Sequence, residues 1–483
     1  MKSLILTLLI FCPALFAAQP NIILIFTDDQ GYNDLGCFGS KTIKTPHLDR
    51  MADEGLILTS FYAQPVCGVS RAALMTGSYP IRVGEPGNVK NLHTVPHPEE
   101  ITMAEILKGA GYATALIGKW HLAGNPKGPE NSFDPALMPN AQGFDYFYGT
   151  PRFNGFTVYV DDTEMRSRIM RNQEVIVEAV ESWDHITQDY TREALAWIEK
   201  NQEHPFFLYL AHNLPHIPVG ASENFKGKSE YGPYGDTIEE IDWSCGEIFK
   251  KLKELKLDEN TLVVFTSDNG PWVETTRAMK PDGAPFIPRD HSGSADPLRG
   301  WKMSAWDGGS RVPFIARWPG KIPAGSTSDQ LLSTMDLLPT FAALAGADLP
   351  KAEIDGHDAS DFLFNKTKTS PREDYFYYVG CLLTGVRAGS WKLVVPRSDN
   401  PSGTGWWGRM IEEVSEIQLY NLDQDPSEST NVAKTHPRIV QSLMKRIEQA
   451  REELGDLAIT GSGVRLFDEG KRQLQSPIVK KKS

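Results

Sequence analysis

The sequence predicts an α/β protein: a mixed, mostly parallel sheet sandwiched by helices, followed by a smaller α+β unit with an antiparallel sheet. Short apolar runs alternate with helical patterns along most of the chain, which favours a parallel sheet covered on both faces. From about Asp374 the pattern changes to closely spaced short strands and one long polar helix. The 483 residues are enough for a large core and for more than one domain.

The first unit is expected to contain four buried strands, because short uninterrupted apolar runs are typical of strands covered on both faces. We expect them at Asn21–Thr27, Ala113–Ile117, Phe206–Ala211 and Thr261–Ser267. The covering helices are predicted by amphipathic patterns at 47–55, 100–110, 187–201, 236–255 and 333–345.

The second unit is expected to be built from alternating short strands and a helix at 436–454. The strands are predicted at Tyr375–Val379, Gly385–Ala388, Trp391–Val395 and Glu416–Tyr420. We therefore expect an N-terminal domain at 19–365 and a smaller C-terminal domain at 366–483.

Residues 1–18 have the pattern of a secretory signal peptide: Lys2, an apolar run from Leu4, and small residues at Ala17 and Ala18. A lipoprotein signal through Cys12 is less favoured, because a bulky residue precedes this cysteine and a proline follows it. No later stretch approaches the roughly 18–20 apolar residues that span a bilayer, so we expect no transmembrane anchor. The sequence predicts an exported protein, periplasmic or secreted.

The composition excludes some classes of partner and site. A formal net charge of −13 without a basic block argues against a nucleic-acid partner. After signal cleavage only Cys37, Cys67, Cys245 and Cys381 remain, too few and too scattered for a disulfide framework. No Cys-x-x-Cys pair is present, so zinc held by thiolates is not expected.

Two of the predicted strands end in adjacent oxygen donors. Asp28-Asp29 follows the first strand and Asp268-Asn269 follows the fourth. Ligands bind at the carboxyl ends of parallel strands, and hard oxygen ligands suit Ca²⁺ or Mg²⁺. The alternative is that these residues merely begin turns, which Asp and Asn often do. Two such pairs, each directly after a buried run, favour a metal site.

Cys67 comes just before a short apolar stretch that predicts the first turns of a helix, with Ser70 as its N-cap and Gly77 as its stop. A helix N-terminus favours anions, and Arg71 adds a permanent cation that suits an oxyanion. The alternative for a lone cysteine is a buried structural role beside a surface arginine.

Lys119 and His121 follow another apolar run in Gly118-Lys119-Trp120-His121, and in an extended chain they would share one face. A cation and an imidazole together suit an anionic substrate and proton transfer. His212 and His216 follow the third strand, but no further ligand cluster indicates zinc.

Five segments together resemble the type I sulfatases. Cys67-Gly68-Val69-Ser70-Arg71 is similar to the family signature Cys-x-(Pro or Ala)-Ser-Arg, with Val69 as a departure. The four other segments also match in the expected order: Gly118–His121, His212–His216, Leu298–Pro313 and Leu419–Pro426. In general appearance the chain resembles bacterial exported sulfatases that act on glycans.

The resemblance implies an alkaline-phosphatase-like fold whose N-terminal domain is catalytic. It implies that a maturation enzyme converts Cys67 to formylglycine, and that calcium (magnesium is possible) is held by Asp28, Asp29, Asp268, Asn269 and the modified Cys67. Lys119 and Lys302 would bind sulfate oxygens together with Arg71. His121 would contact the formylglycine diol and His216 the leaving group, whereas Arg311 would form a structural ion pair. His212 is either structural or functional.

Trp406, Trp407 and Arg409 lie in a long polar connection. Indole faces stack on sugars and arginine binds anions, so these residues favour a sulfated carbohydrate substrate. The resemblance to bacterial exported glycan sulfatases implies that this carbohydrate is of galactan (carrageenan) or glycosaminoglycan type. Alternatively, they pin the loop to the body of the protein. Two rival functions remain open: a phosphomonoester or phosphonate hydrolase of the same superfamily, and an unmatured glycan-binding relative.

Overall fold

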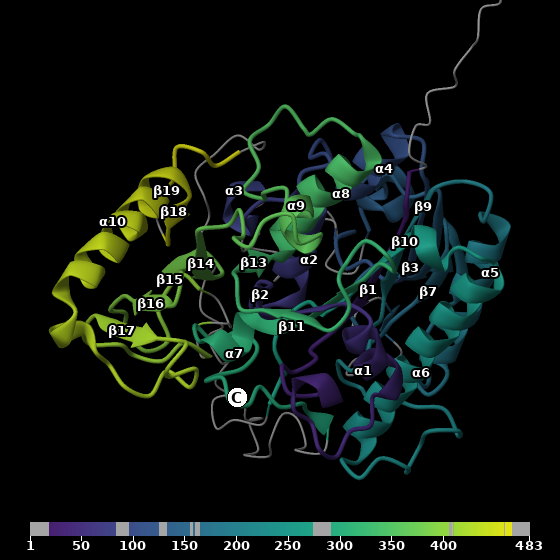
Figure 1. Ribbon diagram of the computed structural model, residues 1–483, viewed down its shortest axis with the longest axis horizontal. Coiled ribbons are helices and arrows are strands. Elements are labelled where there is room, and N and C mark those ends of the chain that lie inside the picture. Colours follow the sequence, from purple (N-terminus) through teal and green to yellow (C-terminus); the bar gives the residue numbers. More distant parts are fainter. Residues whose placement is uncertain are drawn as a thin grey trace, which may run out of the picture.

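The computed structural model has a large mixed sheet between helices, with a smaller sheet and helix α10 beside it (Figure 1). The structure describes residues 19–83, 96–124, 133–154, 158–159, 165–273, 291–404, 408, 410–457 and 459–465. The expected signal peptide at 1–18 and the residues Trp406, Trp407 and Arg409 lie outside these ranges. Among the helices in these ranges, none is both long enough and apolar enough to cross a membrane.

Five parallel strands form the centre of the large sheet. In spatial order they are β10 (Thr261–Ser267), β1 (Asn21–Thr27), β9 (Phe206–Ala211), β3 (Ala113–Lys119) and β4 (Tyr146–Thr150). Alternate residues of β1 pack into two different cores, with Leu24 in one and Ile25 in the other. This burial on both faces explains the continuous apolar runs, and the four predicted strands are confirmed.

Further strands, most of them antiparallel, widen the sheet at both edges and make it mixed. On one side β11 (Arg311–Arg317) pairs antiparallel with both β10 and β2 (Leu56–Tyr62). Two short strands, β12 (Ser326–Ser328) and β13 (Leu332–Ser333), pair in parallel with β2. On the other side β7 (Ile169–Arg171) pairs with β4 and with β8 (Glu174–Val177). The strands β5 (Val158–Tyr159) and β6 (Met165–Arg166) form a separate ribbon.

Helices cover both faces of this sheet. One layer contains α1 (Pro46–Asp53), α5 (Ile186–Lys200) and α6 (Pro233–Glu254). The other contains α2 (Cys67–Thr76), α4 (Met103–Gly109) and α8 (Leu337–Ala345). The remaining short helices are α3 (Pro80–Val83), α7 (Asp307–Ser310) and α9 (Ser360–Leu363). Single 3₁₀ turns occur at Gly36–Phe38, Pro135–Leu137, Pro139–Gln142, Asp258–Asn260, Thr334–Asp336 and Ala433–Thr435. The predicted helices of this unit are confirmed to within three residues at each end, except that the last begins as a 3₁₀ turn.

The C-terminal part contains a four-stranded antiparallel sheet and one long helix, as predicted. The strands are β14 (Asp374–Val379), β15 (Leu382–Ala388), β16 (Trp391–Val394) and β17 (Gln418–Asn421), in that order. Helix α10 (Pro437–Glu453) packs on them, and β18 (Gly455–Asp456) pairs with β19 (Ile459–Thr460). Tyr62 and Met335 of the first unit share a core with this sheet, so the two units are packed together.

A buried charge network also joins the small sheet to the segment that precedes β11. Asp307 accepts hydrogen bonds from Tyr377 at 2.6 Å and Tyr62 at 2.8 Å. Lys392 of β16 pairs with Glu428 at 2.6 Å and donates to the carbonyl of Ala305 at 3.3 Å. Losing one partner of such a buried network would leave a charge without compensation, so the network fixes this segment firmly.

Candidate active site

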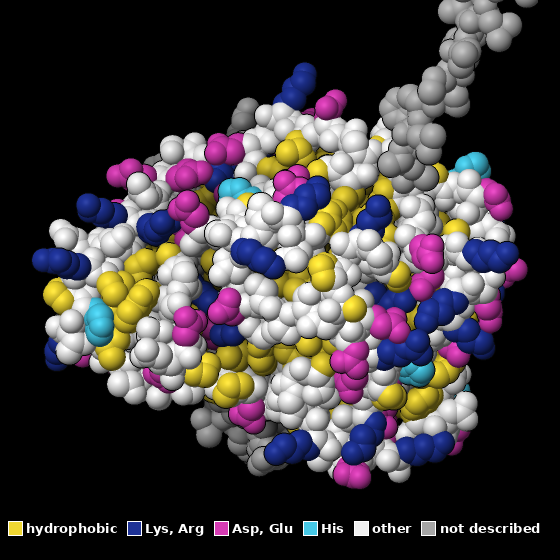
Figure 2. All heavy atoms as spheres, viewed as in Figure 1, with side chains coloured by type: hydrophobic (Ala, Val, Ile, Leu, Met, Phe, Trp, Pro, Cys, Tyr) yellow, Lys and Arg dark blue, Asp and Glu magenta, His cyan; other side chains and the backbone are white. Residues whose placement is uncertain are grey.

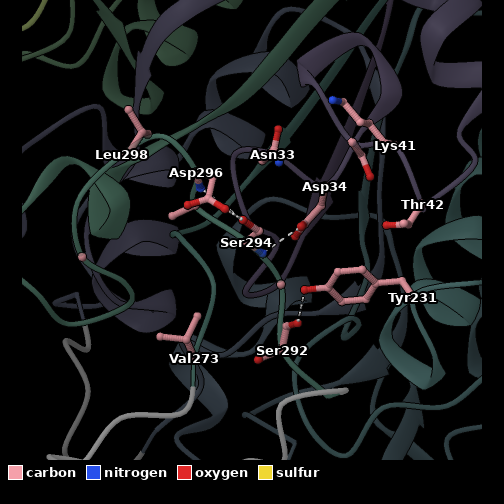
Figure 3. A pocket seen from close by; sticks show the side chains of 14 residues that line it. Asn33, Asp34, Lys41, Thr42, Tyr231, Val273, Ser292, Ser294, Asp296 and Leu298 are labelled. Carbon is pink, nitrogen blue, oxygen red and sulfur yellow. Dashed lines mark hydrogen bonds between the residues drawn. The ribbon is translucent and has the colours of Figure 1, made fainter. Parts of the chain in front are cut away.

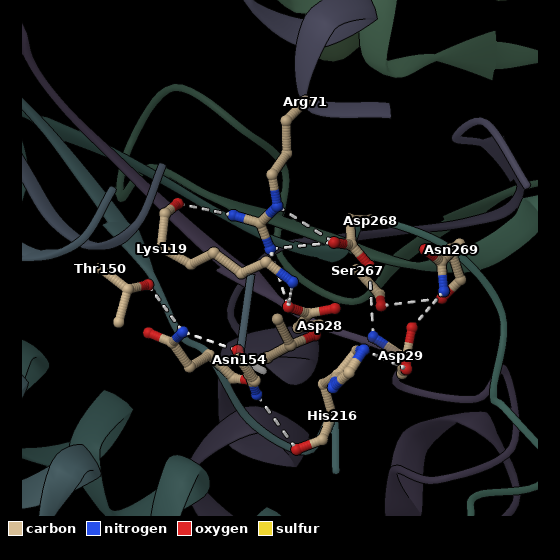
Figure 4. A network of polar contacts seen from close by, with 12 residues as sticks. Asp28, Asp29, Arg71, Lys119, Thr150, Asn154, His216, Ser267, Asp268 and Asn269 are labelled. Carbon is tan, nitrogen blue, oxygen red and sulfur yellow. Dashed lines mark hydrogen bonds and ion pairs between the residues drawn. The ribbon is translucent and has the colours of Figure 1, made fainter. Parts of the chain in front are cut away.

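The two pairs of oxygen donors predicted at the strand ends, Asp28-Asp29 and Asp268-Asn269, lie side by side (Figure 4). Thr27 and Ser267 are partners in the parallel ladder of β1 and β10, so the residues that follow them emerge together. The amide of Asn269 donates to Asp29 Oδ1 at 2.7 Å, and the backbone N–H of Asp29 donates to Asp268 Oδ1 at 3.2 Å. The sheet thus gathers three carboxylates and one amide at one buried edge.

Cys67 is the first residue of α2, so this helix begins four residues earlier than predicted. Ser70 is therefore not the N-cap; its hydroxyl lies inside the helix and accepts the backbone N–H of Gln64 at 3.3 Å. Ser70 therefore holds the preceding loop in place instead of capping the helix. The N-cap position is occupied by an apolar residue, Val66. Gly77 ends the helix at φ 63° as predicted, because glycine adopts this left-handed conformation at no steric cost.

The sulfur of Cys67 lies within the acidic cluster. Its ligand atom and those of Asp28 and Asp268 are all within 4.8 Å of one another. Burial raises the pKa of the Cys67 thiol to about 11, although Lys119 and Lys302 act in the opposite direction. Desolvation outweighs the favourable helix position, so the unmodified side chain is a neutral thiol at pH 7 and not a resting thiolate.

Val69, the departure from the family signature, has a packing role. It is buried in an apolar cluster with Met303, with Val379 and Leu382 of the small sheet, and with Ile411. A larger apolar side chain at this position therefore fills space between the helix and the C-terminal part.

Three buried cations face the acidic cluster. Lys119 contacts Asp28, and Lys302 pairs with Asp29 at 2.6 Å. The guanidinium of Arg71 lies 2.9 Å from Asp268 and also donates to the carbonyl of Lys119 at 2.8 Å. Arg71 thus holds Asp268 in place, whereas the two lysines carry compact charges on flexible stems. Three carboxylates and three cations balance within this buried site.

His216 lies beside Asp29, with Nε2 3.6 Å from Oδ2 of this carboxylate. Burial lowers the pKa of His216 to about 4, so its ring is neutral at pH 7. The Nδ1 atom is 2.6 Å from the carbonyl of Ile217, which assigns the hydrogen to Nδ1. The neutral ring therefore presents the lone pair of Nε2 to the site. Trp272 packs edge-on against His216 and lies 4.8 Å from Lys302 Nζ.

His121 is buried, but β3 ends at Lys119, before this histidine. Its φ is 72°, so the chain is no longer extended there and the predicted shared strand face is wrong. Asp29 and Met303 also have positive φ values, 63° and 68°. Non-glycine residues in this region are strained by about 1–3 kcal/mol each, and such strain concentrates at functional sites.

His212 is buried away from the acidic cluster, and neither of its nitrogens has a hydrogen-bond partner in the described part of the chain. Desolvation alone lowers the pKa of His212 to about 3. These observations favour the structural role over the functional one. Arg311 forms the expected ion pair, 3.4 Å from Asp307.

We expect His212→Phe to remove part of the acid sensitivity of folding. The pKa of His212 is depressed in the folded state, so its stabilising contribution is full above pH 6.5 and is lost as the pH falls toward 3. Between pH 7 and pH 4 the loss is about 3 kcal/mol for this one group. Denaturant titrations of both proteins at pH 7 and 4 measure the difference. An unchanged pH dependence in the variant would contradict the neutral buried assignment.

A second polar network, which was not predicted, supports the backbone at His216. Asn213 donates to Thr150 and to Asn154, both at 2.8 Å, and Asn154 donates to the carbonyls of Asn213 at 2.9 Å and His216 at 3.4 Å (Figure 4). Thr150 ends β4, and Asn154 and Asn213 follow β4 and β9, at the same edge of the sheet as Asp28 and Asp268. The polar residues close behind these buried strands were the signal that could have identified the network.

The donor set fits a hard divalent cation. Asp28 Oδ1, Asp29 Oδ2 and Asn269 Oδ1 are buried and accept no hydrogen bond within the described residues. Burial and the adjacent Asp28 carboxylate raise the pKa of Asp268 to about 7. Burial also disfavours ionised Asp28, but Lys119 and other nearby cations hold its pKa well below its usual range. Oxygens without a hydrogen bond, and a carboxylate whose pKa is raised by its neighbour, are what a bound Ca²⁺ or Mg²⁺ would relieve.

Comparison with known proteins identifies the family. The family model described as Sulfatase matches residues 20–347, more than half of the chain. The chain belongs to the sulfatase family. A second model, the C-terminal region of aryl-sulfatase, matches residues 370–466. Sulfatases are sulfuric ester hydrolases, so the predicted enzyme class is confirmed.

Two curated sulfatases are similar over almost the whole chain. An N-acetylgalactosamine-6-O-sulfatase of Bacteroides thetaiotaomicron is 34% identical, covering 90% of this chain and 93% of its own. Human steryl-sulfatase is 33% identical, covering 90% of this chain and 88% of its own. The relatives thus include enzymes named for a sulfated sugar and for a sulfated sterol.

Solved structures confirm the fold. One from work on glycosaminoglycan metabolism by Bacteroides thetaiotaomicron has a TM-score of 0.74 at 31% identity, covering 90% of this chain and 100% of the other. Ps i-CgsB in complex with k-i-k-neocarrahexaose has a TM-score of 0.70 at 29% identity, covering 89% and 92%. A phosphonate monoester hydrolase of Agrobacterium radiobacter, at 20% identity and a TM-score of 0.59, shares the fold alone. The predicted alkaline-phosphatase-like class, with its small antiparallel C-terminal sheet, is correct.

Proposed function

We propose that this sulfatase removes sulfate from a carbohydrate, of galactan or glycosaminoglycan type. The observation that carries the proposal is the pair of saccharide-related matches: a relative named for N-acetylgalactosamine 6-sulfate and a neighbouring structure in complex with a carrageenan hexasaccharide. Both cover about nine-tenths of this chain. The sterol-directed relative is equally similar in sequence, so the assay below includes a steroid sulfate.

We propose that the site works with a divalent cation, calcium or magnesium, and with formylglycine at position 67. Asp28, Asp29, Asp268, Asn269 and the modified Cys67 would hold the cation, which would supply Lewis-acid neutralisation of the sulfate charge. Formylglycine would supply a hydrated aldehyde as the nucleophile. The conversion requires a maturation enzyme as a partner, and at 3% exposure Cys67 must be modified before the chain closes around it.

The side chains already present would prepare the substrate. Lys119 and Lys302 would exchange part of their contact with the carboxylates for sulfate oxygens, and so lower the repulsion that a nucleophile meets. Arg71 would keep Asp268 oriented without contacting the substrate. We assign His216 to the leaving-group side of the ester; because its Nε2 carries a lone pair in the tautomer above, this nitrogen would have to bind a proton before it could give one to the departing alcohol. We assign His121 to the diol of formylglycine.

The remaining sequence predictions stay proposals. We propose export through the signal at 1–18, a catalytic domain at 19–365 and a C-terminal domain at 366–483.

On the face shown in Figure 2, acidic and basic side chains are interspersed over the surface. That face presents no single-sign basic field of the kind that binds nucleic acid. Trp406, Trp407 and Arg409 remain proposed substrate contacts.

We expect the enzyme to hydrolyse nitrophenyl sulfate with a kcat/KM at least about tenfold above that for nitrophenyl phosphate, a difference of about 1.4 kcal/mol in transition-state binding. Charge alone does not predict which ester is preferred, because a dication and two lysines suit both sulfate and phosphate esters. The expected preference for sulfate rests on membership of the sulfatase family. Ion chromatography of sulfate released from chondroitin 6-sulfate, κ-carrageenan oligosaccharides and a steroid sulfate identifies the substrate class. A preference for phosphate would favour the phosphohydrolase alternative.

A further inference from the structure

A polar cavity of about 480 Å³ lies among loops at one end of the large sheet (Figure 3). Loops that follow β1 and β10 form its walls, together with the loop before α6. Two of its lining residues adjoin active-site residues in the chain: Val273 follows Trp272, and Gly300 lies two positions before Lys302. The walls of the cavity therefore continue, along the chain, into residues of the proposed sulfate site, and its volume lies in the usual range of small-molecule sites, about 300–1,000 Å³.

The wall of this cavity is a built structure held by one buried carboxylate. Asp34 accepts hydrogen bonds from the backbone N–H of Gly31 at 2.7 Å, from that of Ser294 at 2.8 Å and from the hydroxyl of Tyr234 at 2.6 Å. The Tyr234 hydroxyl is also 3.5 Å from the carbonyl of Asp29. A single network therefore links the cavity wall to a proposed cation ligand, so that the two lie in fixed relative positions.

The groups that face the cavity indicate its ligand. Asn33, Ser40 and Thr42 offer an amide and hydroxyls, which suit a ligand rich in hydroxyl groups. Lys41 is exposed and makes no ion pair with another described residue, and Asp296 places one carboxylate at the rim. The lining thus has one cation, Lys41, and two carboxylates, Asp34 and Asp296, so the cavity has no excess of positive charge. The cavity is therefore poorly suited to a second sulfate.

We propose that this cavity binds the sugar ring next to the sulfated one, and that it takes a ring rich in hydroxyls and without a sulfate of its own. The proposal rests on the proposed carbohydrate substrate. The enzyme would then recognise two parts of the saccharide chain. The active site would bind the sulfate group, and Asn33 and Lys41 would hydrogen-bond the hydroxyl groups of the neighbouring sugar ring.

The test compares Asn33→Ala and Lys41→Ala with Lys44→Ala, an exposed lysine of the same loop that does not line the cavity. Each cavity variant should raise KM about three- to tenfold on a κ-carrageenan or chondroitin 6-sulfate tetrasaccharide, the loss expected for one hydrogen bond. Hydrolysis of nitrophenyl sulfate, which is too small to reach the cavity, should stay within twofold of wild type, as should both activities of Lys44→Ala. Mass spectrometry of position 67 confirms equal maturation of all proteins.

The outcomes distinguish a failure of the cavity proposal from a failure of the proposed carbohydrate substrate. If the tetrasaccharides are hydrolysed but the cavity variants match Lys44→Ala, the cavity proposal is wrong and the carbohydrate substrate stands. If nitrophenyl sulfate is turned over but neither tetrasaccharide is, the carbohydrate substrate is wrong and the cavity proposal fails with it. A lower KM for an ι-carrageenan tetrasaccharide, whose neighbouring ring carries a sulfate, than for the κ form would contradict the preference for an unsulfated ring.

Discussion

Cys67→Ser, produced in a bacterial host that converts only cysteine, is expected to lose at least about a hundredfold in kcat, or about 2.7 kcal/mol of transition-state stabilisation. The substitution removes the precursor of the proposed nucleophile and leaves a serine hydroxyl, which cannot form an aldehyde hydrate. Folding should survive, because the two side chains differ little in size and position 67 lies in a small buried cluster. Sulfate release and a thermal melt measure the two effects. Activity above a tenth of wild type would contradict the role of Cys67.

The matched control is Cys245→Ser. Cys245 is also fully buried, but it lies in α6 among the apolar residues of the other face of the sheet. Its replacement should affect stability alone and leave kcat unchanged. In the wild-type enzyme, mass spectrometry of the tryptic peptide 51–71 should show position 67 as formylglycine. An unmodified cysteine in an inactive protein that still binds sulfated saccharides would favour the unmatured glycan-binding alternative.

The central strands could be predicted because their sequences are apolar without interruption. β1, β9 and β10 are buried along their whole length, and each is followed directly by a polar residue. β2 and β11 were not predicted. β2 is less completely buried than the central strands, since Ile57 and Thr59 are half-buried, and its polar Thr59 interrupts the apolar run. In β11, Pro313 lies where the register of the pairing with β2 shifts. Their antiparallel pairing is fixed only by contacts between residues far apart in the chain.

The residue types of the active site could also be predicted, but their electrostatic arrangement could not. Adjacent donors after two strands indicated the acidic cluster, and the three-dimensional structure shows that Asp28 lies close enough to Asp268 to raise its pKa. The clamp of Arg71 on Asp268 and the support of His216 through Asn154 depend on the packing of separate loops. No periodicity in the sequence encodes such contacts.

Removal of the divalent cation should abolish activity, with a loss at least as large as that of Cys67→Ser, and calcium should restore it. Without the cation, three carboxylate or amide oxygens keep no hydrogen bond in a buried site, and the lysines stay paired with Asp28 and Asp29 instead of with sulfate. Dialysis against a chelator followed by titration with Ca²⁺ or Mg²⁺ measures the effect. Metal analysis that finds stoichiometric zinc, with little calcium or magnesium, would contradict the assignment.

Cation binding can also be measured without turnover, through the thermal stability of the protein. A cation that binds only the folded protein at a hundred times its Kd stabilises it by about 2.7 kcal/mol, so calcium should raise the melting temperature of the chelated enzyme. Asp29→Asn and Asp268→Asn should remove most of that increase, whereas Asp361→Asn, which alters an exposed ion pair with Lys366, should keep it. Because Arg71 holds Asp268, Arg71→Lys should also weaken the calcium response even though Arg71 is no ligand. An increase that persists in both carboxylate variants would place the cation elsewhere in the molecule.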